Sequence, residues 1–263
     1  MRLDIYIHEN GYTESRERAK ALIMAGVVYV DNQKIDKAGY NIKENQIVEV
    51  RDGLKYVSRG GYKLEKAINS FAINLENKIC ADIGASTGGF TDCMLQNSAK
   101  KVYAIDVGYG QLAWKLRTDP RVINLERTNF RYVTNNDIEN LLDFASIDVS
   151  FISLSKILPV LHPLLKESGE AVALIKPQFE AGKNKIGKNG VVKDEKTHIE
   201  VIQKIIDLSL ETGFEIIDFD FSPIKGPQGN IEFLLYIKKS ENPQNKSKKT
   251  IEQVIRQANE EAK

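Results

Sequence analysis

The stretch Asp82-Ile83-Gly84-Ala85-Ser86-Thr87-Gly88-Gly89-Phe90-Thr91 decides the fold of this chain. An apolar run, 79–83, leads into its glycines, and a helix-like segment, 90–95, follows them. This order predicts a strand, a tight turn and the start of a helix. Glycines let a ligand approach the backbone closely, and unpaired N–H groups at a helix start attract anions. The stretch therefore predicts a ligand-binding loop.

The glycine spacing narrows the choice of ligand. Gly84, Gly88 and Gly89 do not form the G-x-G-x-x-G of dinucleotide sites, and the Gly-Lys-Ser/Thr of a phosphate loop does not follow. Asp82 precedes the first glycine, and Asp106 ends the next apolar run. This arrangement suits S-adenosylmethionine, with its methionine and sugar portions on the loop and its ribose hydroxyls on Asp106. An ordinary glycine-rich turn is the alternative that the motif alone leaves open. The predicted cofactor-binding residues are Asp82, Gly84, Ser86, Thr87, Gly88, Gly89, Phe90 and Asp106.

Positive charge is locally concentrated, although the net charge of the 263 residues is only +1. Basic side chains gather in 55–66 and in 238–249, and the segment 183–193 holds four lysines and no acid. Such patches can hold a polyanion on one face of a neutral protein. For any single patch, a solvated surface loop is the alternative.

Cysteine usage and hydropathy indicate a soluble, cytoplasmic protein. The two cysteines, Cys80 and Cys93, form no C-x-x-C pair and read as small core residues of a reducing compartment. The segment 1–5 is too charged for a signal peptide, and the longest apolar runs are only as long as strands. No metal site is predicted, because the histidines lack ligand spacing: His8, His162 and His198.

Residues 1–52 predict a small α+β domain. Leu3, Ile5 and Ile7 alternate with polar residues, which is the period of a strand. Thr13 can cap a helix that runs to about Met24. Short strands are expected near 27–30, 35 and 47–50.

The helix of this domain presents basic residues, and the sequence segments 15–19 and 23–31 form a specific motif. They resemble the RNA-binding module named after small-subunit ribosomal protein four. The resemblance implies that RNA is bound by Arg16, Arg18 and Lys20. A dimerisation module with a charged helix is the alternative.

The remainder of the chain predicts an α/β domain. A glycine-containing linker, 53–61, precedes a domain over 62–263 in which strands and helices alternate. Seven apolar strands with interleaved helices mean a doubly wound sheet, in which ligands bind at the carboxyl ends of the strands. The strands are expected near 79–83, 101–106, 121–125, 145–150, 170–176, 214–221 and 230–237. A capping box, Thr250 to Gln253, begins a last helix with one apolar stripe, which we expect to dock on this domain.

Four polar residues stand at the borders of these apolar segments: Lys63, Asp148, Lys176 and Glu232. Each alone is compatible with a surface charge at a strand end. Together they resemble the Lys-Asp-Lys-Glu set of FtsJ-type RNA 2′-O-methyltransferases, and the surrounding words resemble the TlyA branch, historically called haemolysin A. These words lie at 57–64, 82–92, 148–154, 176–180, 190–194 and 222–233.

The resemblance implies a Rossmann-like, seven-stranded methyltransferase domain that uses S-adenosylmethionine to methylate a ribose 2′-hydroxyl of ribosomal RNA, at a cytidine. The lysine-rich segment 183–193 follows the Lys176 strand, so we predict that Lys183, Lys185 and Lys188 contact the RNA backbone, as does Arg59 of the patch 55–66. A disordered loop is the alternative for 183–193. One departure concerns the linker. Some members carry Arg-x-Trp-Val where this chain has Leu54-Lys55-Tyr56-Val57.

The chemistry explains why these residue types are needed. A ribose hydroxyl becomes a good nucleophile only as it loses its proton, so the enzyme must position it and supply a general base. A lysine can be that base if desolvation and a second ammonium lower its pKa. We assign the base to Lys176, and Lys63 would either supply the second charge or hold the ribose phosphate. Asp148 and Glu232 would orient both lysines.

Three other functions compete with this interpretation. A nicotinamide-dependent oxidoreductase would need the missing G-x-G-x-x-G. A membrane-active cytolysin would need a spanning segment or a basic amphipathic helix. An RNA-binding protein without catalysis would have no need of the four-residue set.

Overall fold

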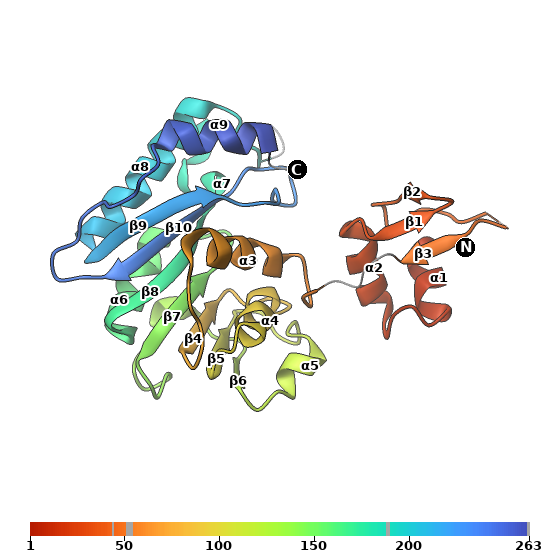
Figure 1. Ribbon diagram of the computed structural model, residues 1–263, viewed down its shortest axis with the longest axis horizontal. Helices are drawn as coiled ribbons and strands as arrows, with labels where there is room; N and C mark the ends of the chain where they lie inside the picture. Colours follow the sequence, from red (N-terminus) through yellow and green to blue (C-terminus); the bar gives the residue numbers. More distant parts are fainter. Residues whose placement is uncertain (44, 51–54, 188–189, 262–263) are drawn as a thin grey trace. The chain divides into compact units, whose positions relative to one another are not determined.

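The computed structural model describes residues 1–43, 45–50, 55–187 and 190–261, and the chain divides into two compact units, Met1–Arg59 and Gly60–Lys263 (Figure 1). Gly53 and Leu54, at the start of the predicted linker, lie outside the described residues, as does Lys188.

Among its described residues, the first unit contains two helices and a small antiparallel sheet. The helices are α1 (Leu3–Glu9) and α2 (Arg16–Met24), and the strands are β1 (Val28–Val30), β2 (Gln33–Lys34) and β3 (Val48–Val50). The sheet has the order β2-β1-β3. The predicted α+β composition is therefore present.

Two local predictions for this unit were wrong. Residues 3–9 form helix α1, because Leu3 and Ile7 lie one turn apart and both are completely buried. The cap of α2 is Ser15, whose side chain accepts a hydrogen bond from the Arg18 backbone N–H at 3.2 Å. The hydroxyl of Thr13 instead donates to the Ser15 carbonyl.

The second unit contains the predicted seven-stranded sheet, which is confirmed. Its strands are β4 (Ile79–Ile83), β5 (Lys101–Ile105), β6 (Val122–Leu125), β7 (Leu142–Ile147), β8 (Leu165–Ile175), β9 (Phe214–Phe221) and β10 (Phe233–Lys239). They are ordered β6-β5-β4-β7-β8-β10-β9, and β10 runs antiparallel to both of its neighbours.

Helices pack on both faces of this sheet (Figure 1). On one face α3 (Gly60–Phe71) packs against α4 (Gly89–Gln96). On the other, buried side chains of α6 (Leu158–Leu164), α8 (Glu195–Glu211) and α9 (Ile251–Glu261) join one core. The shorter helices are α5 (Trp114–Arg117), α7 (Pro177–Glu180), η1 (Phe130–Tyr132), η2 (Leu154–Lys156) and η3 (Lys183–Lys185).

The predicted docking of the last helix is confirmed. The Thr250 N–H donates to Gln253 Oε1 at 2.9 Å, and the Gln253 N–H donates to Thr250 Oγ1 at 3.3 Å, which completes the capping box. Three members of its apolar stripe, Val254, Ile255 and Ala258, are fully buried, and the fourth, Ile251, is half-buried. Cys80 and Cys93 are buried free thiols, as predicted.

The strand register brings distant polar residues to one edge of the sheet. Ile83, at the end of β4, pairs with Ile105 and Ile147, so that Gly84, Asp106 and Asp148 follow three strand ends that are level. Because β10 is antiparallel, its first residue, Phe233, pairs with Ile175 at the end of β8. Glu232 and Lys176 therefore emerge at the same edge. Across the residues described, every helix is too short or too polar to cross a membrane.

Candidate active site

The four predicted catalytic residues form one ion-pair cluster. Lys63 Nζ donates to Glu232 Oε2 at 2.7 Å and to Asp148 Oδ2 at 3.3 Å. Lys176 Nζ lies 2.5 Å from Asp148 Oδ1. The Asp148 carboxylate thus bridges two ammonium groups, and two positive charges face two negative ones.

Each member is held by a different element. Lys63 lies in the first turn of α3, and Lys176 lies between β8 and α7, where its Nζ also donates to Ser150 Oγ at 3.2 Å. The Asp148 backbone N–H donates to the Ile83 carbonyl at the end of β4 at 2.9 Å. Glu232 immediately precedes β10 and is 1% exposed.

The charges of the cluster stabilise one another against burial. Burial disfavours a charged Lys63, but the carboxylates of Asp148 and Glu232 outweigh it, so that the pKa of Lys63 is raised. Burial likewise disfavours a charged Asp148, yet Lys63 and Lys176 hold the pKa of Asp148 below its usual value. Lys63 and Asp148 are therefore ionised at neutral pH.

The glycine loop touches this cluster through its backbone. Gly84 has a φ of +87°, and a Cβ added to it would lie 2.5 Å from the carbonyl oxygen of Asp148. Gly88, with a φ of +92°, is the N-cap of α4, and a Cβ there would collide with Leu112 and Leu116. Both glycines are required by close packing of the protein on itself.

Asp82 lies inside the domain. It is 1% exposed, and its Oδ2 accepts from the Thr91 N–H at 2.8 Å and from the Thr91 hydroxyl at 2.7 Å. Burial raises the pKa of Asp82 to about 7, although these hydrogen bonds oppose the rise. The carboxyl fastens the start of α4. Gly89 and Phe90, in the first turn of α4, are also buried.

Asp106 lies at the exposed side of the loop. Its Oδ2 accepts from the Ser86 N–H at 2.8 Å and its Oδ1 from the Gly108 N–H at 2.7 Å. Ser86 and Thr87 are exposed. An ionised carboxylate has about four acceptor positions, so that Asp106 can still accept from two hydroxyl groups. These residues fit a ligand that presents a ribose diol.

The basic residues of the first unit differ in what they contact. Arg16 Nε donates to Asp4 Oδ2 at 2.9 Å, and Arg2 Nε donates to Asp4 Oδ1 at 2.9 Å. Asp4 is completely buried, and the hydrogen bond from Arg2 is the main cause that lowers the pKa of Asp4 to about 2. Arg18 Nη1 donates to the Val57 carbonyl at 2.7 Å, so Arg18 fastens the segment before α3.

Arg2 and Asp4 were not predicted from the sequence. The pattern that could have identified them is a pair of opposite charges on either side of the buried Leu3.

The remaining basic residues that were predicted to bind RNA differ in their surroundings. Lys20 is half-buried, and Arg59 Nη1 donates to the Met24 carbonyl at 3.3 Å. In the second unit, Lys185 pairs with Glu200. Lys188 and the side chain of Lys183 lie outside the part of the chain that the structure describes.

Two further residues beside the cluster were also missed. Phe151, three positions after Asp148, has a φ of +63°, is 91% exposed and packs against Phe179 at 5.0 Å between ring centroids. Glu180 accepts from the Ser153 hydroxyl and the Leu154 N–H, both at 2.7 Å. It therefore ties the segment after Lys176 to the segment after Asp148. A bulky residue with positive φ cannot be recognised from its sequence neighbours.

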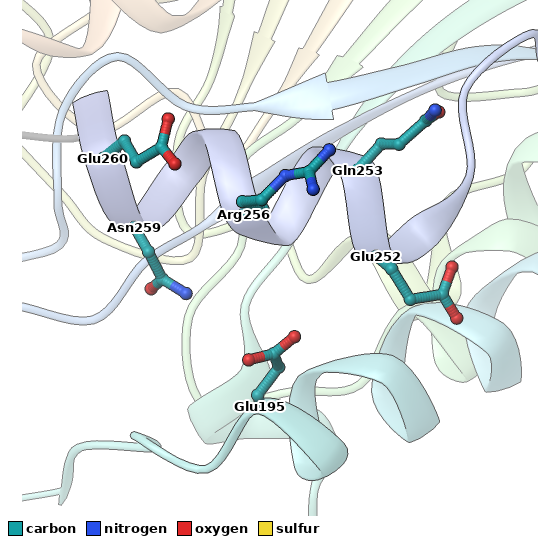
Figure 2. A pocket seen from close by; sticks show the side chains of 6 residues that line it. All are labelled: Glu195, Glu252, Gln253, Arg256, Asn259 and Glu260. Carbon is teal, nitrogen blue, oxygen red and sulfur yellow. The ribbon is translucent and has the colours of Figure 1, made fainter.

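A separate polar cavity of about 370 Å³ lies between α9 and the start of α8 (Figure 2). Three acids and one arginine contribute to its lining, so that it does not suit a polyanion. The lining residues are Glu195, Glu252, Gln253, Arg256, Asn259 and Glu260. Within the described residues, no group of three or more His, Cys, Asp or Glu side chains could hold a metal ion.

Comparison with known proteins agrees with this arrangement. Residues 56–239 match the FtsJ-like methyltransferase family, and residues 1–48 match the S4 domain. The Bacillus subtilis protein named "Putative rRNA methyltransferase YqxC" is 53% identical over 238 residues, which cover 90% of this chain and 85% of that protein.

Two other proteins are similar over most of the chain. The Mycobacterium tuberculosis protein named "16S/23S rRNA (cytidine-2'-O)-methyltransferase TlyA" is 40% identical over 239 residues, which cover 90% of this chain and 89% of that protein. The solved structure named "Putative hemolysin from Streptococcus thermophilus" has a TM-score of 0.81 at 48% identity, and covers 99% of this chain and 96% of that one. The resemblance predicted from the sequence words is confirmed.

Proposed function

Because the chain belongs to the FtsJ-like methyltransferase family, we propose that it transfers a methyl group from S-adenosylmethionine to a ribose 2′-hydroxyl of ribosomal RNA, at a cytidine. The observation that carries this proposal is the cluster of Lys63, Asp148, Lys176 and Glu232, which packs against the glycine loop through Gly84. The names of the similar proteins support the choice of ribosomal RNA and of cytidine.

The glycine loop is the proposed cofactor site. When bound, S-adenosylmethionine supplies a methyl group on a sulfonium centre, which is a strong leaving group. Asp106 would accept from the ribose hydroxyls of the cofactor, and the exposed Ser86 and Thr87 would contact its other polar groups. Gly84, Gly88 and Gly89 shape the loop, while Asp82 and Phe90 support it from within.

The ion-pair cluster is the proposed catalytic site. Lys176 is the general base: in its neutral amine form, its Nζ accepts the proton of the target hydroxyl as the hydroxyl attacks. Lys63 remains protonated, since its pKa is raised, and supplies a fixed positive charge close to the Asp148 carboxylate. Asp148 orients both lysine side chains, and Glu232 holds Lys63. Accurate positioning of the hydroxyl supplies a large part of the rate.

RNA would be held by sequence-independent contacts to its phosphates. Arg2 and Arg16, which Asp4 aligns side by side, suit phosphate oxygens, as do Lys20 and the segment 183–193. Phe151 exposes an aromatic ring beside the cluster, and this ring could stack against a nucleotide base that has been extruded from the RNA helix. These contacts suit a protein that acts on ribosomal RNA, and we place that action in the cytoplasm, where ribosomal subunits are found.

The test is transfer of labelled methyl groups from S-adenosylmethionine to isolated ribosomal subunits and to intact ribosomes. We expect label in ribosomal RNA, and a block to alkaline cleavage at one cytidine, because a 2′-O-methyl group removes the attacking hydroxyl. Label on a base, or transfer to no ribosomal substrate, would contradict the proposal. Lysis of erythrocytes by the same preparation, unchanged by Lys176→Ala, would instead favour the cytolysin alternative.

A further inference from the structure

Asn230 connects two segments that lie far apart in the chain. It is 1% exposed, its Oδ1 accepts from the Val192 N–H at 2.9 Å, and its Nδ2 donates to the Gly190 carbonyl at 2.9 Å. Glu232 of the catalytic cluster follows only two residues later. One amide side chain therefore joins the end of the lysine-rich segment to the turn that presents Glu232.

We infer that Asn230 is a positioning residue, which sets the place of the Glu232 carboxylate by holding residues 190–192 against the turn 222–232. This inference rests on the proposed function, because it assigns a role in the same catalytic cluster. It goes beyond the cluster itself, since Asn230 touches none of its four side chains in any hydrogen bond among the described residues.

The carboxylate of Glu232 packs against the turn 222–232. The Ser222 N–H donates to the Glu232 carbonyl at 2.8 Å, and the Gly226 N–H donates to the Asn230 carbonyl at 2.9 Å. A Cβ added to Gly226 would lie 2.7 Å from Glu232 Oε1. The other oxygen, Oε2, accepts from Lys63. A shift of the turn would therefore move the carboxylate away from Lys63.

The segment 190–192 is fixed on its other side by His198. Val192 is 3% exposed, and its carbonyl lies 3.2 Å from Nε2 of His198. Burial lowers the pKa of His198, so the neutral ring donates from Nε2 to this carbonyl. Asn230 and His198 together satisfy both backbone polar groups of Val192.

A role in positioning differs from a role in stability alone. If Asn230 acts through Glu232, replacing Asn230 should not lower kcat further in a protein whose Glu232 has already been replaced. A purely structural asparagine would slow methyl transfer only by unfolding the protein, and its effect would add to that of any other substitution. A double-mutant cycle separates the two.

The experiment compares Asn230→Ala with a matched control, Asn97→Ala, in the full chain. Asn97 Nδ2 also donates to a backbone carbonyl, that of Cys93 at 2.8 Å, but at the end of α4 away from the glycine loop. We expect Asn230→Ala to lower kcat about tenfold with an unchanged KM for S-adenosylmethionine. Asn97→Ala should leave kcat within about twofold of the original protein.

The cycle uses Glu232→Gln as the second substitution. In that background Asn230→Ala should lower kcat by less than about twofold. Gly226→Ala should give the same pattern, because its Cβ would displace the carboxylate directly. Multiplicative losses in the double variant, or a normal kcat for Asn230→Ala, would overturn the inference.

Hydrogen exchange tests the inference without any catalysis. The Ser222 amide, which bonds to the Glu232 carbonyl, should exchange faster in Asn230→Ala than in Asn97→Ala at equal global stability. Equal rates would overturn the inference. A failure of the original protein to methylate ribosomal RNA would reject the proposed function alone, and the exchange rates would still decide the role of Asn230.

Discussion

Lys176 Nζ lies 2.5 Å from Oδ1 of Asp148, while Oδ2 of the same carboxylate accepts from Lys63. The two lysines share this carboxylate, but their other partners differ. Lys63 has a second carboxylate, Glu232, at 2.7 Å, whereas Lys176 has the neutral hydroxyl of Ser150 at 3.2 Å. Among the described residues, Lys176 therefore has one carboxylate at ion-pair distance and Lys63 has two, which supports the proposed assignment of the general base to Lys176.

Replacing Lys176 should abolish methyl transfer without disturbing the cofactor site. We expect Lys176→Ala to lower kcat by about 10²- to 10⁴-fold, the usual contribution of a general base. Calorimetric affinity for S-adenosylmethionine should remain within about twofold, since the predicted cofactor residues lie elsewhere. Lys166→Ala, which removes the half-exposed partner of Asp143, is the control. Near-normal turnover of Lys176→Ala would exclude it as the base.

Removing Lys63 should destabilise the second unit. Lys63→Ala leaves the buried Glu232 without its charged partner, and breaking a buried pair in this way costs about 3–5 kcal/mol. Urea unfolding measures the change in the free energy of unfolding. Lys63→Ala combined with Glu232→Gln should recover part of the loss, because the second change removes the unpaired charge. A double variant as unstable as the sum of the singles would contradict this account.

Asp82 should make the stability of the second unit depend on pH. Its pKa is about 7 in the folded protein, against about 3.9 in an unfolded chain, so the folded state binds the proton more tightly. Its contribution is therefore fully present below pH 4 and is lost as the pH rises towards 7. Asp82→Asn keeps an acceptor for Thr91 and should be more stable than the original protein at pH 8.

The measurement is urea unfolding of both proteins at pH 5 and pH 8. The difference in the free energy of unfolding between Asp82→Asn and the original protein should grow from pH 5 to pH 8. A difference that is the same at both pH values would show that the carboxyl stays charged throughout. The affinity of Asp82→Asn for S-adenosylmethionine also tests the predicted role of Asp82 in cofactor binding. A lower affinity is expected if Asp82 contacts the cofactor, and an unchanged affinity if Asp82 only supports α4.

Gly84 should resist even the smallest side chain. In Gly84→Ala the new Cβ would meet the backbone carbonyl of Asp148, which cannot rotate away, and the residue would keep a φ of +87°. We expect a loss of about 1–3 kcal/mol in the free energy of unfolding and lower methyl transfer, because Asp148 must move. Gly110→Ala is the matched control: its φ is +72°, but open space surrounds its Cβ. If both substitutions lowered the free energy of unfolding equally, the positive φ angle would account for the loss, and the clash with the Asp148 carbonyl would not.

Much of the second unit was predictable because its signals are local. The run 79–83 before the glycines predicts β4, and the Thr250–Gln253 capping box predicts α9, and both elements lie where expected. Local signals were misleading in the first unit. Leu3, Ile5 and Ile7 have the period of a strand, but burial of Leu3 and Ile7 on one face makes the segment helical.

The sequence by itself determined which residue types the site contains, because lysines and carboxylates at the ends of apolar runs are visible without a structure. Only the tertiary structure decided how they meet. Glu232 precedes β10, and only the antiparallel course of β10 brings it to the edge where Lys176 follows β8. Only packing turned Asp82 inward and Asp106 outward. Pairing of distant strands and burial of side chains depend on contacts between residues far apart in the chain, which local patterns do not specify.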